Sequence, residues 1–92
     1  MTWRRRVDRN HKEIRDGLRA CGFDVWDCSR FGGGFPDLLV YAHGRLFLLE
    51  VKMPGEDLTL PEELFRSSFP VVIVHSLEEA TSATSRLPPS RP

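Results

Sequence analysis

The stretch GGGFPDLLVYAHGRLFLLEVK, residues 32–52, decides the fold of this chain. It holds two apolar runs, 38–41 and 46–49, separated by the tetrapeptide Ala-His-Gly-Arg at 42–45. Two such runs around a short turn that contains glycine are typical of a β-hairpin. We therefore expect an antiparallel pair of strands here.

The position of the turn determines which side chains face each other. If His43 and Gly44 form its centre, Asp37 lies opposite Glu50. Like charges directly opposed on one sheet face are about 5 Å apart at Cβ and destabilise the pair, so we expect a cation between them. A three-residue loop would shift the pairing by one residue and place the two carboxylates on different faces.

Lys52 follows Glu50 by two residues and so shares its face of the strand. Hard cations such as Mg²⁺ or Mn²⁺ choose carboxylate oxygens. An ammonium beside such an ion can orient or help deprotonate a water and can neutralise charge on a phosphate. Asp37, Glu50 and Lys52 therefore predict phosphodiester hydrolysis. The structural alternative is that Asp37 caps a strand and the other two form an exposed strand end.

Pro36-Asp37 followed by Glu50-Val51-Lys52 resembles the motif of the PD-(D/E)xK nuclease superfamily. The preceding glycines and the following helix resemble its VRR-NUC branch, close to Holliday-junction resolvases, and the likeness covers roughly residues 8–80. It implies a restriction-endonuclease-like core and a Mg²⁺-dependent DNA endonuclease for branched or duplex DNA. In this interpretation Asp37 and Glu50 bind the metal, the carbonyl of Val51 adds a ligand, and Lys52 assists the attacking water.

The resemblance bears on two further positions. In that family an acidic residue on the first helix often completes the metal site, and Glu13 matches it best, with an ordinary surface glutamate as the alternative. The family often carries a glutamine or a similar polar group on the helix after the lysine, whereas this chain contains no glutamine. That departure leaves the orientation of the scissile phosphate open.

Size and charge bound the function. Ninety-two residues with 40% hydrophobic content predict a single small domain. Thirteen basic and thirteen acidic residues cancel, so the chain lacks the positive field of a protein that binds DNA by bulk electrostatics. Neutral charge favours a second hypothesis, a non-catalytic nucleic-acid-binding or assembly subunit that retains the nuclease fold. A homodimer is expected, because symmetric cutting of two strands needs two centres.

Periodicity divides the chain into a basic arm (1–7), one domain (8–85) and a proline-rich, disordered tail (86–92). Within the domain we expect helices at 8–21, 61–67 and up to about 85, and strands at 23–28, 38–41, 46–49 and 71–75. The order α-β-β-β-α-β-α is that of an α/β domain with a mixed sheet of about four strands flanked by helices. Both faces of the hairpin are apolar, so helices should cover both.

Two segments are candidates for DNA contact. Arg4, Arg5 and Arg6 either bind phosphates or form a solvated, frayed terminus. Three consecutive glycines, Gly32, Gly33 and Gly34, either let a phosphate or a DNA strand approach or form a flexible turn.

Several classes are not supported by the sequence. Cys21 and Cys28 are too few for a zinc site and are expected to stay reduced. No apolar run is long enough to span a membrane, and no phosphate-binding loop for a nucleotide cofactor follows the glycines. We therefore expect a soluble protein of the cytoplasm, and the resemblance implies a bacterial or phage source.

Overall fold

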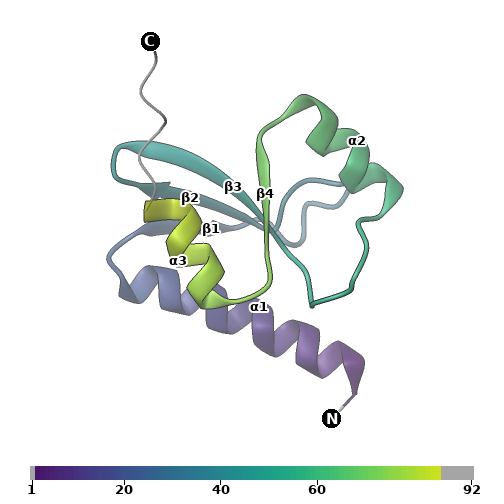
Figure 1. The fold of residues 1–92 in the computed structure, drawn as a ribbon, viewed down its shortest axis with the longest axis horizontal. Helices are drawn as coiled ribbons and strands as arrows, with labels where there is room; N and C mark the ends of the chain where they lie inside the picture. Colours follow the sequence, from purple (N-terminus) through teal and green to yellow (C-terminus); the bar gives the residue numbers. More distant parts are fainter. Residues whose placement is uncertain (1, 86–92) are drawn as a thin grey trace.

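The computed structural model describes residues 2–85 and shows an α/β fold with a four-stranded mixed sheet (Figure 1). The elements are α1 (Trp3–Ala20), β1 (Asp24–Asp27), β2 (Leu38–Ala42), β3 (Arg45–Val51), α2 (Leu60–Ser68), β4 (Val71–Val74) and α3 (Leu77–Ser85). The predicted order α-β-β-β-α-β-α is confirmed. The tail predicted at 86–92 lies outside the described residues.

The central hairpin has the predicted register. Ala42 pairs with Arg45, and Leu38 pairs with Leu49. His43 and Gly44 both have positive φ, 54° and 76°, which is the backbone of a two-residue hairpin turn that matches the twist of the strands. The three-residue loop is therefore excluded. Extending the register by one residue places Asp37 opposite Glu50.

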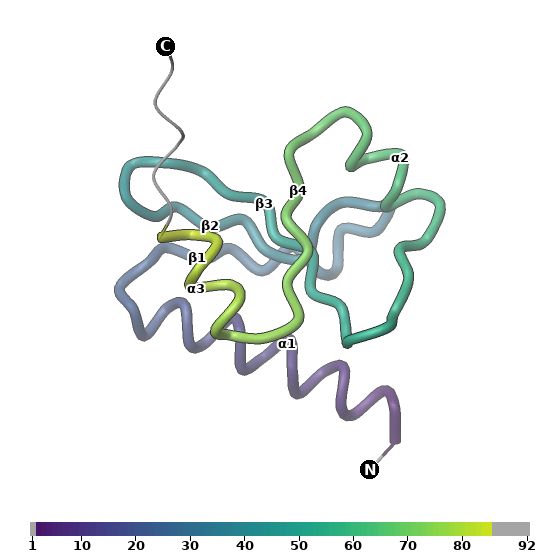
Figure 2. The backbone as a smooth tube through the Cα atoms, viewed as in Figure 1, coloured from purple at the N-terminus to yellow at the C-terminus, as the bar shows by residue number. Residues whose placement is uncertain are grey.

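The strands lie in the order β1-β2-β3-β4. β1, β2 and β3 are antiparallel neighbours, whereas β4 runs parallel to β3. A parallel pair needs a crossover connection, and α2 lies within it. Figure 2 shows this crossover as a wide excursion of the backbone between the end of β3 and the start of β4.

The core lies between one face of the sheet and the helices α1 and α3. Ile14 and Leu18, one helical turn apart on α1, are fully buried against β-strand residues such as Leu38 and Leu49. A Cβ on Gly17 would lie 2.4 Å from Leu77, so this glycine allows α3 to approach α1 closely. The apolar stripe of α1 thus determines which sheet face is covered.

The opposite face of the sheet is open over β1, β2 and the start of β3. Trp26 and Leu46 are each 66% exposed and Tyr41 is 49% exposed. α2 lies beyond the end of the strands instead of over this face (Figure 1). The expectation that helices cover both faces is therefore wrong for this part of the sheet.

α1 begins at Trp3 instead of Asp8. Thr2 caps the helix, because its hydroxyl accepts a hydrogen bond from the backbone N–H of Arg5 at 3.4 Å. The three arginines therefore belong to the first turns of α1 and do not form a separate arm. The apolar stripe predicted a later start because these exposed turns carry no apolar periodicity.

Across residues 2–85, no helix has the length and apolar character required to cross a membrane.

Candidate active site

A pocket of about 480 Å³ lies at the end of the sheet where β1 and β3 finish and β2 begins. It contains Asp37, which directly precedes β2, together with Glu50 at the end of β3 and Lys52 just beyond it. The hairpin brings these residues together across its open end. Other ionisable residues complete the lining: Asp8, His11, Arg15, Asp27, Arg30, Glu56 and Glu62.

Asp37 is held rigidly. Its Oδ2 accepts a hydrogen bond from the backbone N–H of Val51 at 2.8 Å. Its own carbonyl accepts one from the N–H of Cys28 at 2.7 Å, and the preceding Pro36 is buried. The carboxylate therefore bridges β2 and β3 at the position where the hairpin opens.

Glu50 is 3% exposed. Burial raises its pKa to about 10, and a hydrogen bond with the Asp37 carboxyl and the charges of Asp37 and Glu62 add to this, whereas Lys52 lowers it. Two carboxyl groups this close cannot both be ionised at neutral pH without a compensating charge. A cation that enters here displaces the proton.

Lys52 is 6% exposed and lies between two glutamates. Its Nζ is 2.8 Å from Oε1 of Glu62 and 3.6 Å from Oε2 of Glu56. Burial lowers the pKa of Lys52, but the hydrogen bond and charge of Glu62, followed by the charges of Glu56 and Glu50, outweigh this and raise it above its ordinary value. The ammonium is therefore charged and fixed in place.

Glu62 is a residue of this site that the sequence did not reveal as one. It lies in the first turn of α2, where Thr59 and Glu62 form a capping box. The capping-box spacing was a visible signal for the start of a helix, but not for a partner of Lys52. Glu62 occupies the helix after the lysine, on which the resembled family often carries a glutamine.

The glycine loop places α2 against the site. Gly34 has φ +84°, and a Cβ there would lie 2.2 Å from the carbonyl oxygen of Pro61 in the first turn of α2. Only glycine allows this approach. Gly32 and Gly33 have no heavy atom within 4 Å of such a Cβ. The loop therefore has one clear packing role, at Gly34, while a ligand role for Gly32 and Gly33 stays a prediction.

α1 forms the other wall of the pocket through a group that we call the Asp27 cluster: His11, Arg15, Asp27 and Ser29. Asp27 Oδ2 lies 3.1 Å from His11 Nε2 and 3.0 Å from Arg15 Nη1. Its Oδ1 accepts hydrogen bonds from the backbone N–H and the hydroxyl of Ser29, at 3.0 and 2.6 Å. Burial raises the pKa of Asp27, but the bonds from Ser29, His11 and Arg15 outweigh this and hold its pKa well below the ordinary range.

Glu13 does not reach the pocket, so the prediction that it could reach the sheet is wrong. Its side chain is 60% exposed and pairs with Arg9 at 3.1 Å. Successive residues of a helix differ by about 100°, so Glu13 lies about 200° around α1 from His11.

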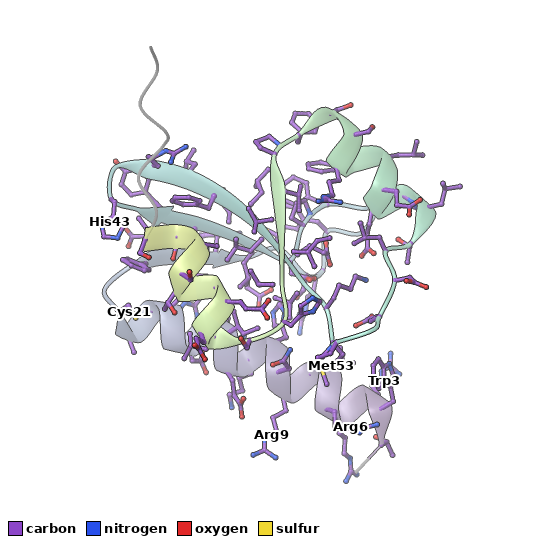
Figure 3. All side chains as sticks on the ribbon, in the orientation of Figure 1. Trp3, Arg6, Arg9, Cys21, His43 and Met53 are labelled. Carbon is purple, nitrogen blue, oxygen red and sulfur yellow. The ribbon has the colours of Figure 1, made fainter. Side chains whose placement is uncertain are left out.

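The three N-terminal arginines are exposed as well and do not line the pocket. Figure 3 shows Arg6 and Arg9 projecting from α1 away from the sheet.

The lining of the pocket is strongly acidic. Six acidic side chains (Asp8, Asp27, Asp37, Glu50, Glu56 and Glu62) line the pocket with the cationic side chains of Arg15, Arg30 and Lys52, and Glu50 is the one of the six that keeps its proton. Residues 2–85 contain no cluster of three or more His, Cys, Asp or Glu side chains arranged to hold a metal ion. Mg²⁺, however, is usually held by one or two carboxylates, with waters and substrate phosphates as its other ligands. The pair Asp37 and Glu50 fits that requirement.

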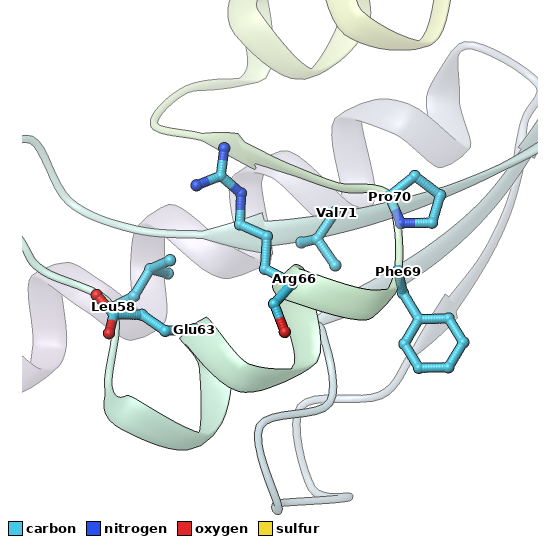
Figure 4. A pocket seen from close by; sticks show the side chains of 7 residues that line it. Leu58, Glu63, Arg66, Phe69, Pro70 and Val71 are labelled. Carbon is cyan, nitrogen blue, oxygen red and sulfur yellow. The ribbon is translucent and has the colours of Figure 1, made fainter.

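A second pocket, of about 400 Å³, lies between α2 and the start of β4 (Figure 4). Glu63 and Arg66 are its charged lining residues, beside apolar ones such as Phe69 and Pro70. It has no paired carboxylates, so it offers no comparable chemistry.

No family model, curated protein or solved structure matches this chain.

Proposed function

We propose that this protein is a Mg²⁺-dependent endonuclease that hydrolyses phosphodiester bonds in DNA. One observation carries the proposal: two carboxyl groups, Asp37 and Glu50, are crowded together in a polar pocket beside the buried ammonium of Lys52. Such crowding is costly unless a cation offsets it. Membership of the PD-(D/E)xK superfamily, in its VRR-NUC branch, is part of the same proposal and rests on the residue pattern.

Each residue has a distinct role in this proposal. Asp37 and Glu50 hold the ion, and the carbonyl of Val51 adds a ligand. When bound, Mg²⁺ supplies a water of lowered pKa and offsets the negative charge of the phosphate. Lys52, kept charged by Glu62, orients that water and stabilises negative charge that develops on the phosphate oxygens. Mn²⁺ has the same ligand preference and should substitute.

The second candidate is a non-catalytic nucleic-acid-binding or assembly subunit with the same fold. It is favoured by the ion pair between Lys52 and Glu62, because an ammonium already engaged at 2.8 Å is less available to a water. The two candidates differ in one respect that can be measured. A nuclease turns DNA over in the presence of a divalent ion, whereas a binding subunit does not.

The test is cleavage of labelled linear, flapped and four-way DNAs with Mg²⁺, with Mn²⁺ and with chelator. We expect metal-dependent cleavage of at least one substrate and its loss in Asp37→Asn. Asp57→Asn is a matched control, since Asp57 is exposed and does not line this pocket. Activity of Asp37→Asn at the wild-type rate would show that the site is misplaced. Absence of cleavage on every DNA would favour the binding subunit.

We also propose that the functional unit is a homodimer that pairs through the open sheet face. The exposed centre of this face is formed by Trp26, Tyr41 and Leu46, and Asp24, beside Tyr41, is the one charged residue that lines the same hollow. Depletion of charge and enrichment in aromatic residues are features of homodimer interface cores. A formal net charge of zero means that two copies do not repel each other at long range.

The proposed setting is the cytoplasm of a bacterium, or of the bacterial host of a phage. Cys21 and Cys28 are both free thiols in the structure. Unpaired cysteines are typical of a reducing compartment, in which disulfides rarely persist.

A further inference from the structure

The Asp27 cluster is the most highly organised polar group of the pocket that the proposed hydrolysis does not use. His11 and Arg15, four residues apart on α1, both contact the Asp27 carboxylate at the end of β1. All three side chains are at least three-quarters buried. A carboxylate that accepts four hydrogen bonds has little capacity for a ligand of its own. Asp27 therefore acts as a positioning residue for its two neighbours on the helix.

Arg15 keeps donors that the protein does not use. Arg15 donates from Nε to Asp16 and from Nη1 to Asp27. Among the described residues, no hydrogen bond engages its Nη2, and Arg30 forms no ion pair. Within residues 2–85 no buried side-chain nitrogen or oxygen lacks a partner, so these unused donors are accessible to solvent. They line the pocket that contains Asp37 and Glu50.

We infer that the Asp27 cluster, together with Arg30, binds a phosphodiester group of the DNA strand next to the group that is cut. The inference rests on the proposed function. Arginine is the residue that best matches phosphate geometry, since its planar fork can donate two parallel hydrogen bonds. Arg15 is already oriented by two carboxylates, so little side-chain freedom is lost when a phosphate binds.

Charge explains why such a subsite is needed. The acidic lining of the pocket attracts a cation but repels the DNA backbone. A bound divalent ion offsets that repulsion only for the phosphate that it touches. The next phosphate along the strand lies about 3.4 Å further along the duplex axis and needs a cation of its own. Arg30, which forms no ion pair among the described residues, supplies that charge. Arg15 adds its unused hydrogen-bond donors from the α1 side of the same pocket, which is large enough for more than one group.

The arginines of this subsite are not the ones that the sequence suggested for DNA contact. The run Arg4 to Arg6 is the densest positive charge in the chain, but its side chains are exposed at the start of α1 and do not line the pocket. Proximity to the carboxylate pair distinguishes Arg15 and Arg30 from those three.

The experiment measures DNA binding instead of cleavage. Fluorescence anisotropy of a labelled duplex in Ca²⁺, with DNA integrity checked on a gel, gives the dissociation constant at several salt concentrations. We expect Arg15→Ala and Arg30→Ala each to bind several-fold more weakly, with a slope of log K against log salt reduced by about 0.9 for each lost phosphate contact. Arg9→Ala, an equal loss of charge on the same helix but at an exposed site, should bind as wild type.

Two controls keep the outcomes separate. Arg15→Ala also removes a partner of Asp27, so Arg30→Ala, at an exposed position without an ion pair, serves as the variant that keeps the fold. Duplexes with a 5′-phosphate and with a 5′-hydroxyl distinguish an internal diester from a terminal monoester. Equal affinity for the two ends supports the diester, and an effect of Arg15→Ala restricted to the 5′-phosphate overturns it.

Wild-type affinity and an unchanged salt slope in both variants would overturn the subsite while leaving the nuclease intact, provided that wild type cuts and Asp37→Asn does not. Conversely, DNA binding that depends on Arg15 and Arg30 in a protein that cuts no DNA would retain the subsite and overturn the nuclease.

Discussion

The ammonium of Lys52 lies 2.8 Å from Oε1 of Glu62, a residue on the helix that crosses from β3 to β4. Both side chains are largely buried, at 7% and 18% exposure, and Glu62 Oε1 also accepts a hydrogen bond from the N–H of Thr59 at 2.8 Å. One carboxylate therefore fixes the start of α2 and the position of the lysine together. The stability of the helix and the geometry of the site depend on the same group.

Replacing Glu62 should therefore cost both stability and activity. Glu62→Ala leaves Lys52 with only Glu56, at 3.6 Å, and removes the capping box, so we expect the free energy of unfolding to fall by about 3 kcal/mol. Urea unfolding measures this. Glu63→Ala is the matched control, because Glu63 is in the same helical turn but exposed. Equal losses for the two variants would mean that the contact with Lys52 contributes nothing.

Removing Lys52 should separate catalysis from metal binding. Lys52→Ala takes away the group that orients the water but neither carboxylate, so we expect cleavage to fall by about 10²- to 10⁴-fold. Mn²⁺ affinity, followed by calorimetry, should be retained. A variant that cuts at the wild-type rate, or that no longer binds Mn²⁺, would contradict the role given to Lys52.

The pKa of Glu50 predicts how stability depends on pH. Its folded value of about 10 lies above the unfolded value of about 4.3, so the folded state retains a proton that the unfolded state loses. In chelator, the contribution of Glu50 is therefore complete below about pH 4 and declines as pH rises towards 10, by up to about 1.4 kcal/mol per pH unit. Thermal melts at pH 5, 7 and 9 should show a smaller decline for Glu50→Gln than for wild type. An equal decline in stability for Glu50→Gln and wild type would show that Glu50 is ionised over the whole range from pH 5 to pH 9.

The same proton links pH to metal binding. Because Glu50 must release its proton before it binds Mg²⁺ or Mn²⁺, apparent metal affinity should rise from pH 6 to pH 8. Calorimetry in two buffers of different ionisation enthalpy would detect the released proton. Affinity that is independent of pH would contradict a protonated Glu50.

Two neighbouring glycines should respond very differently to alanine. At Gly33, with φ +64° and open space around it, Gly33→Ala should cost only about 1 kcal/mol of backbone strain. Gly34→Ala adds an overlap with the Pro61 carbonyl and should cost about 3 kcal/mol while also lowering activity, because α2 and Glu62 must move. Chemical unfolding of both variants makes the comparison. Similar losses in the free energy of unfolding for Gly33→Ala and Gly34→Ala would mean that the loop does not hold α2 in place.

The open sheet face predicts the oligomeric state. Trp26→Glu places a charge in the centre of the proposed interface, so we expect light scattering at micromolar protein to show a dimer for wild type and a monomer for this variant. Trp3→Glu alters an equally aromatic side chain, 49% exposed on α1, and should stay dimeric. A wild-type protein that is monomeric with and without branched DNA, yet still cleaves it, would rule the dimer out.

What could be predicted from the sequence is what depends on neighbours along the chain. Alternating strand residues, a two-residue turn at His43 and Gly44, and the short span from Asp37 to Lys52 place the carboxylate pair and the lysine at one end of a hairpin. Each of these relations depends on local geometry: the period of two in a strand and the dihedral preferences of the turn. The element order followed from the same local patterns.

The remaining features depend on how the helices lie on the sheet, and no local pattern specifies that. Which side of α1 faces the pocket is determined by the burial of Ile14 and Leu18, and this rotation brings His11 and Arg15 to Asp27 while it leaves Glu13 in solvent. The approach of α2 to Gly34 likewise decides that Glu62 meets Lys52. These contacts join a helix to a strand end or a loop that no turn geometry connects, so only packing of the complete core could determine them.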